Sequence, residues 1–174
     1  MNATACKYRL EQLLRKELAD WQGLPEACAE EDVARSFPLR PGEGIAHFGS
    51  ELVEYRFRVI ESAGFTEPVR LYFRDATLRL VRTGLWSTDR AECAQLLRDL
   101  GDPPDRLDLT FDVRTIAGGE WVYAARGLTL GVIPDTGLIA AMAAYPPCSI
   151  KAYRQSFYDV EPVREFRSRP SSPA

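Results

Sequence analysis

The sequence predicts an α+β fold, in which antiparallel strands form sheets and the helices pack on one side of them. Apolar residues at three- and four-residue spacing near residue 10 are typical of an amphipathic helix. Apolar and polar residues alternate from Val53 onward, which is typical of half-buried antiparallel strands. Because this order of helix and strands recurs, we expect one compact domain over residues 1–160, with similar helix-plus-meander units at 7–85 and 86–158.

Two helices are expected at the start of the chain. The first is indicated by apolar residues that share one helical face, namely Leu10, Leu13, Leu14, Leu18 and Trp21. Gly23 and Pro25 predict its end. A shorter helix is expected over 29–37, because the acidic residues of its first turn favour the helix dipole. Pro38 and Pro41 then break the chain.

Three strands are expected in the first half, separated by turns at Gly64, Pro68 and Asp75-Ala76. Alternation predicts which side chains point toward the core. These are Val53, Tyr55, Phe57 and Val59, then Val69, Leu71 and Phe73, then Leu78 and Leu80.

The second half repeats this order. Asp89 with Glu92 forms a predicted capping box that opens a helix, and Gly101 ends it. Gly118-Gly119 is expected to supply the positive φ of a tight hairpin turn. The strands are expected at 107–113, 121–123, 128–132 and 138–145.

The C-terminal end is expected to combine a short helix with a tail. The helix begins at Ser149 and places Ile150, Tyr153 and Phe157 on one side. Residues 161–174 are polar and rich in proline, so we expect no order there in the isolated chain.

An internal duplication is one interpretation of the recurring order. A shift of fifty positions places Leu71 and Phe73 on Trp121 and Tyr123, and it places Leu78 and Leu80 on two leucines near residue 129. Chance agreement between two amphipathic hairpins is the alternative.

Composition indicates an ordinary soluble protein. The net charge is −3, which argues against general attraction to polyanions. The start of the chain lacks the pattern of a secretion signal, and no segment reaches membrane-spanning length, so we expect a cytoplasmic location and no membrane contact. The four cysteines, Cys6, Cys28, Cys93 and Cys148, are therefore expected to be reduced thiols; a disulfide would require export.

The sequence offers no catalytic, metal or nucleotide-binding motif. His47 is the single imidazole, and its neighbours give no nucleophile signature, so a loop or strand-end role is favoured. A metal site at 28–32 is the weaker interpretation, because the acidic residues there are explained by the start of a helix. We therefore expect no cofactor and no enzymatic activity. An enzyme whose site is assembled around His47 from distant residues is the alternative.

Arginine supplies 19 of the 22 basic residues, and several arginines share the predicted outward side of the first sheet. If the three strands are neighbours, these residues form one basic surface that could bind carboxylate or phosphate. A solvated sheet face is the alternative interpretation. The candidate binding residues are Arg56, Arg58, Arg70, Tyr72, Arg74 and Arg79.

The outward side of the second sheet is expected to be small or apolar, so it should be covered by a helix of the chain or by a partner. If the chain's own helix covers it, Trp121 and Tyr123 belong to the opposite core face; if the burial is reversed, they become interface anchors. The predicted outward residues are Val122, Ala124, Thr129, Gly131, Ala140, Met142 and Ala144.

The order of a helix, a glycine-proline stop and a meander with Trp-x-Tyr, over residues 88–145, resembles the helix-plus-sheet unit of the outer-membrane assembly lipoprotein BamE. Used twice, this unit is similar in plan to the β-lactamase inhibitor proteins. The resemblance implies a binding surface on a sheet and no catalysis, as in toxin-neutralising immunity proteins. We therefore expect a non-enzymatic protein-binding module with a protein partner. A nucleic-acid or anionic-ligand binder that uses the arginines is the alternative.

Overall fold

Eight antiparallel strands form one sheet, in agreement with the predicted α+β class. The computed structural model describes residues 2–61, 64–111 and 114–159, so the predicted tail at 161–174 lies outside the described residues. The sheet order is β1-β2-β3-β4-β8-β7-β6-β5, in which two four-stranded meanders join through their last strands. The strands are β1 (Arg40–Phe48), β2 (Val53–Ile60), β3 (Val69–Arg74), β4 (Thr77–Thr83), β5 (Asp105–Phe111), β6 (Arg114–Tyr123), β7 (Leu128–Ile133) and β8 (Leu138–Ala144).

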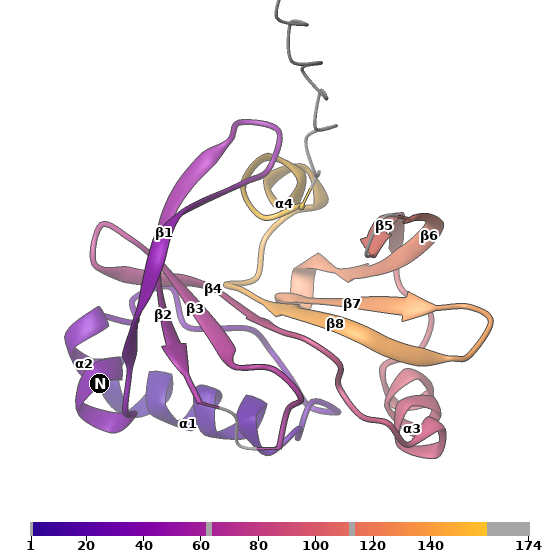
Figure 1. Ribbon diagram of the computed structural model, residues 1–174, viewed down its shortest axis with the longest axis horizontal. Coiled ribbons are helices and arrows are strands. Elements are labelled where there is room, and N and C mark those ends of the chain that lie inside the picture. Colours follow the sequence, from indigo (N-terminus) through magenta and orange to yellow (C-terminus); the bar gives the residue numbers. More distant parts are fainter. Residues whose placement is uncertain (1, 62–63, 112–113, 160–174) are drawn as a thin grey trace, which may run out of the picture.

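Three helices pack on one face of the sheet, and a fourth lies on the other face (Figure 1). The first group is α1 (Asn2–Leu14), α2 (Glu30–Ser36) and α3 (Arg90–Leu100). Their apolar residues form one core with Leu71, Leu128 and Leu130 of the sheet. The fourth helix, α4 (Ile150–Ser156), contributes Tyr153 to a second core on the opposite face. We call these the helical face and the hollow face.

Helix α1 ends at Leu14, seven residues before the predicted last apolar position, Trp21. Lys16 adopts a left-handed conformation with φ of 62°, and its N–H bonds to the carbonyl of Leu13. The N–H of Glu17 reaches back to the carbonyl of Gln12, which completes a helix-ending pair of bonds. Trp21 is nevertheless buried, because the following loop folds back over the sheet.

The prediction that all cysteines are reduced is wrong for two of them. Cys6 of α1 and Cys28, which precedes α2, form a disulfide with Cα atoms 5.5 Å apart. The sequence separation of 22 hid this pairing, because it depends on how α1 packs beside α2. Disulfides persist mainly in oxidising compartments, and the cytoplasmic location stays a prediction. Cys93 is a free, buried thiol, as predicted.

Two strand predictions need correction. The predicted break at Pro41 is wrong, because Pro41 lies in strand β1, where an irregularity between Pro41 and Ile45 at the edge of the sheet accommodates it. Gly118-Gly119 lies within β6 and is not a hairpin turn. The register with β5 shifts nearby, between Leu107 and Leu109, which is typical of a β-bulge.

The duplication stays a prediction. Each half contains a meander, but the shift of fifty positions aligns β3 with β6 and β4 with β7. By position in the sheet, β4 corresponds to β8, its central partner. The spacing that suggested duplication therefore does not match the order of the strands.

Among the helices of the described residues, none combines the length and apolar character needed to cross a membrane.

Candidate functional site

The hollow face is the concave side of the sheet, where the two meanders incline toward each other (Figure 1). Its buried residues include Tyr55, Tyr72 and Leu80 from the first meander, and Leu107 and Val122 from the second. Both halves therefore contribute to one surface. The positions face this way because paired residues in an antiparallel sheet point to the same side.

Helix α4 covers one end of this face. The turn after β1 binds it through three backbone hydrogen bonds, in which Gly49, Ser50 and Glu51 donate to carbonyls between Arg154 and Tyr158. The hydroxyl of Tyr55 also donates to the carbonyl of Ser156 at 2.9 Å. The predicted cover of the second meander by one of the chain's own helices is therefore confirmed for Val122 and Ala124, which share the core of Tyr153.

Part of the predicted outward set faces the other way. Met142 and Ala144 belong to the core of the helical face. The cause is a bulge in β8, where Gly131 pairs with Ala141 and Val132 pairs with Ile139, so that Ala140 is an extra residue. The alternation of side chains shifts by one at that point.

A buried polar cluster lies beneath α4. The hydroxyl of Tyr153 donates to the carboxylate of Glu120, and both residues are buried. Arg82 of β4, which is separated from β6 by β7 and β8, donates to the carboxylate of Asp159 at 2.7 Å. Thr129, Arg82, Glu120 and Tyr153 also line a depression of about 20 Å³, which is space for about one water molecule.

Burial controls the proton affinity of this cluster. Desolvation raises the pKa of Glu120 to about 7, although the Tyr153 hydroxyl and the Arg82 charge oppose the rise. Burial also raises the pKa of Tyr153 well above its ordinary value, and the nearby carboxylate of Glu120 adds to this effect. Glu120 therefore changes its charge near neutral pH, whereas Tyr153 remains a hydrogen-bond donor.

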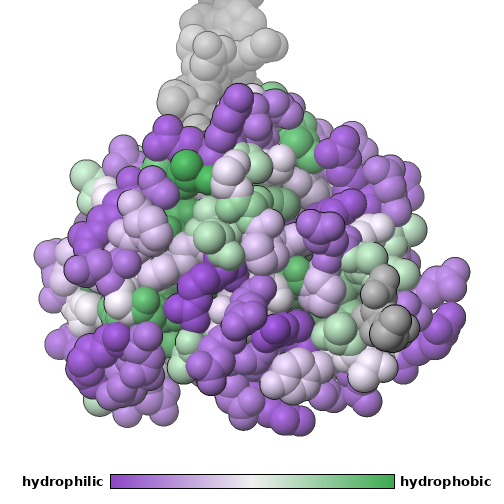
Figure 2. All heavy atoms as spheres, turned by 180° about the vertical axis from the view of Figure 1, so that it is seen from behind, coloured by the Kyte–Doolittle hydropathy of each residue, from purple (hydrophilic) through white to green (hydrophobic). Residues whose placement is uncertain are grey.

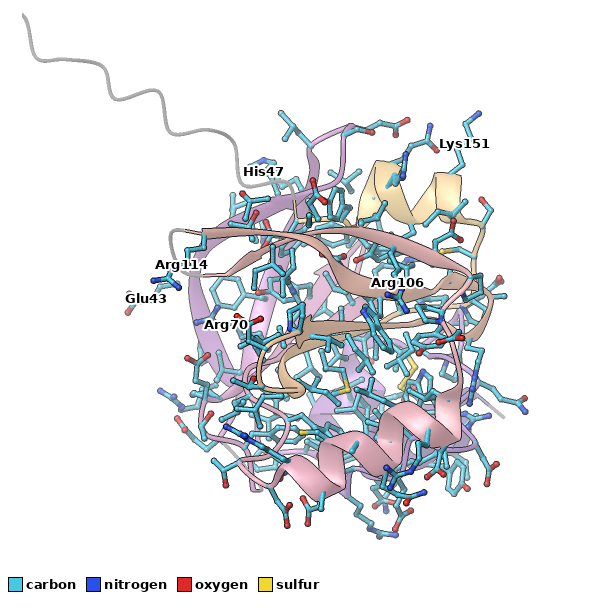
Figure 3. The ribbon with its side chains drawn as sticks, turned by 90° about the vertical axis from the view of Figure 1, so that its right-hand side faces the viewer. Glu43, His47, Arg70, Arg106, Arg114 and Lys151 are labelled. Atoms are coloured by element: carbon cyan, nitrogen blue, oxygen red, sulfur yellow. A yellow bond between two sulfur atoms is a disulfide. The ribbon has the colours of Figure 1, made fainter. Side chains whose placement is uncertain are left out.

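The other end of the hollow face is open. Arg70 of β3 and Arg114 of β6 are exposed there, and Figure 3 shows both at the end of the sheet away from Lys151 of α4. Phe57 and Val59 of β2 are half-buried, and Val59 pairs with Arg70. This end therefore combines two exposed cationic side chains with apolar surface from β2.

The predicted arginine surface is divided between the two faces. Arg56 pairs with Phe73 and Arg58 with Leu71, and both partners belong to the helical core. Arg70 and Arg74 alternate with these residues and share the hollow face with Tyr72. The prediction of one continuous basic surface is therefore wrong.

Several predicted binding residues have structural roles. Arg58 donates to Glu30 of α2 at 2.9 Å, and Arg79 donates to the carbonyl of Glu26 at 3.4 Å. Arg79 is the extra residue of a bulge, because Tyr72 pairs with Leu80 and Phe73 pairs with Leu78. Tyr72 itself is only 4% exposed.

The two aromatic candidates of the second meander lie on the helical face. Tyr123 is buried, and its hydroxyl donates to the carbonyl of Gly101 at 2.7 Å. Trp121 is half-buried beneath Arg106, whose guanidinium lies 4.4 Å from the ring centroid. Of the two predicted alternatives, the structure matches the core position and not the interface anchor.

His47 is exposed on β1, and its Nε2 atom lies 3.8 Å from the carboxylate of Glu54. This matches the predicted strand-end position. Cys28 is held in the disulfide, so it does not supply a thiolate to a metal at 28–32.

The sequence did not predict that Arg82, Glu120 and Tyr153 form a cluster. Glu120 follows two glycines, and Arg82 was not among the arginines of the predicted surface. The available signal is a charged residue inside a strand, but the partner of Glu120 comes from a helix thirty-three positions away.

The chain matches no protein-family model, no curated protein and no solved structure.

Proposed function

We propose that this chain is a non-enzymatic protein-binding module, an inhibitor or toxin-neutralising immunity protein, that binds its partner at the open end of the hollow face. The supporting observation is the two exposed arginines, Arg70 and Arg114, together with the half-buried Phe57 and Val59 on the strand that pairs with the strand of Arg70. Arginine and aromatic residues are enriched where protein interfaces concentrate their binding energy.

The chemistry of this end indicates an acidic partner. A guanidinium binds a carboxylate through two parallel hydrogen bonds, and apolar surface alongside would exclude water from those bonds. The rigid sheet beneath holds the two arginines on separate strands, so a partner segment with two spaced carboxylates fits best. The closed end of the hollow face, under α4, stabilises the sheet and does not contact the partner.

Affinity capture of the tagged chain from its native host tests this proposal. We expect one stoichiometric protein from the wild type, and its loss from a variant that carries Arg70→Glu with Arg114→Glu. Arg90→Glu, at the exposed start of α3, is the matched control and should retain the partner. Equal capture by all three proteins would contradict the proposed site.

A small anionic ligand is a second candidate, because Arg56 and Arg58 line a cavity of about 430 Å³ between β1 and β2. Glu30 also lines this cavity and already binds Arg58. Calorimetric titration with inorganic phosphate tests it: binding that Arg56→Ala removes would support the candidate. A nucleic-acid partner should in addition show a steep loss of affinity with salt.

A further inference from the structure

A cleft of about 850 Å³ lies on the helical side of the molecule, between the C-terminal part of α1 and the side of α3. Figure 2, which views the molecule from behind, shows the hydrophilic surface of α3 standing apart at one lower corner. Leu18, Trp86 and Leu96 line the cleft and are buried, so they form an apolar floor. The proposed function does not use this surface.

Charges of opposite sign line different parts of the cleft. Arg9 of α1 and the two residues that follow the helix, Arg15 and Lys16, make one side basic. The side of α3 is acidic, through Glu92 and Asp99, and Glu17 and Asp20 of the loop after α1 also line the cleft. Arg15 and Asp99 are both exposed.

We propose that this cleft is the interface of a homodimer, in which a second copy of the chain places its basic side on the acidic side of the first. A two-fold axis in the plane of contact makes the same patch face itself. If the axis lies between the two charged sides, each basic group meets an acidic group of the other copy. A patch with separated charges is therefore self-complementary, and the opposite orientation is disfavoured by like charges.

Tyr8 supports this arrangement. It lies on the rim of the cleft and is 60% exposed, which is high for a large aromatic side chain. In a two-fold dimer each Tyr8 would lie over the apolar floor of the other copy, and tyrosine is a frequent interface anchor. Lys16 is already positioned over that floor, with its ammonium 5.6 Å from the centroid of Trp86.

Charge exchange gives a direct test by analytical ultracentrifugation at low salt. The wild type should show a dimer at high concentration and the 19.5 kDa monomer on dilution. Arg15→Glu and Asp99→Lys should each weaken dimerisation by roughly tenfold or more, because each puts like charges face to face twice. Tyr8→Ser should also weaken it. Arg114→Glu, on the hollow face, is the control and should have no effect.

Mixing distinguishes an interface from a folding defect. An equimolar mixture of the Arg15→Glu and Asp99→Lys variants should form a dimer again, since each reversed charge then meets its opposite. The double variant should dimerise by itself for the same reason. A wild type that stays monomeric at all concentrations would overturn the proposal. So would a dimer that neither reversal weakens, or a loss that mixing does not restore.

Discussion

Glu120 shows how a single residue links the two layers of the hollow face. Its carboxylate lies on β6, the second strand from one edge of the sheet, and accepts a hydrogen bond from the hydroxyl of Tyr153 of α4. The raised pKa of about 7 means that the folded protein binds this proton more tightly than the unfolded chain, whose glutamate has its ordinary value of 4.5. The stability from this group is complete below the unfolded pKa and is lost as pH rises through the folded pKa.

We therefore expect stability to decrease from about pH 5 to about pH 8, by roughly 3 kcal/mol, since each pKa unit corresponds to about 1.4 kcal/mol. Glu120→Gln keeps the shape of the side chain without the charge, so it should flatten this profile and raise the melting temperature at the alkaline end. Thermal unfolding across this range measures both effects. Glu17→Gln, on an exposed loop, is the control, and an unchanged slope in Glu120→Gln would contradict the assignment.

Gly127 shows the effect of a close backbone approach. Its φ is +59°, and a Cβ atom there would collide with the carbonyl oxygen of Tyr145. Gly137 has a similar φ of +69° but open space around the same position. Gly137→Ala should therefore cost about 1 kcal/mol, from backbone strain alone.

Gly127→Ala should lower the free energy of unfolding clearly more than Gly137→Ala does, because the backbone at Tyr145, after β8, must also move. Denaturant unfolding of the two variants separates the two effects. Equal losses would show that the contact with Tyr145 relaxes without cost.

The alternation of side chains shows what the sequence could predict about single residues and what it could not. Within β2 and within β3, the prediction of which residues share a side was correct. Each strand has one apolar side, and either face of the sheet could bury it. Since the sheet has a core on both faces, Tyr55 and Leu71 were both predicted to point inward, although they point to opposite sides. The relative phase of neighbouring strands depends on their pairing, which no single strand records.

At the scale of elements, helix and strand identity followed from periodicity, and the exceptions have local causes. Strand β1 escaped prediction because Pro41 and Gly42 replace its apolar positions, and an edge strand tolerates both. Arg79 and Ala140 are bulge residues, and each reverses the alternation of the residues that follow it.

The disulfide fixes two elements to each other. It joins α1 to the segment before α2 and closes a loop with a sequence separation of 22, so its loss should cost about 3 kcal/mol through the entropy of the unfolded chain. We expect this loss in the double variant Cys6→Ala, Cys28→Ala, measured by denaturant unfolding. A reducing agent should destabilise the wild type and leave the variant unaffected. Cys148→Ser, at a free thiol, is the control.

At the scale of the whole molecule, the two meanders share their main core. Only three residue pairs join β4 to β8, but the core of the helical face includes Leu71 and Val81 from one meander and Leu128 and Leu130 from the other. Separating the halves would expose this shared apolar surface to water.

We therefore expect a single cooperative unfolding transition, with equal calorimetric and van't Hoff enthalpies. A chain limited to the predicted unit 7–85 should fail to fold, because it lacks one side of that core. Two resolved transitions, or a folded half, would contradict a shared core.

The central claim is that the open end of the hollow face binds a protein partner. Hydrogen–deuterium exchange of the chain, with and without the captured partner, tests it most directly. We expect the partner to slow exchange in the strand ends that carry Arg70 and Arg114, and to leave α1 and α3 unchanged. Protection confined to α1 and α3, with none at those strand ends, would contradict the claim.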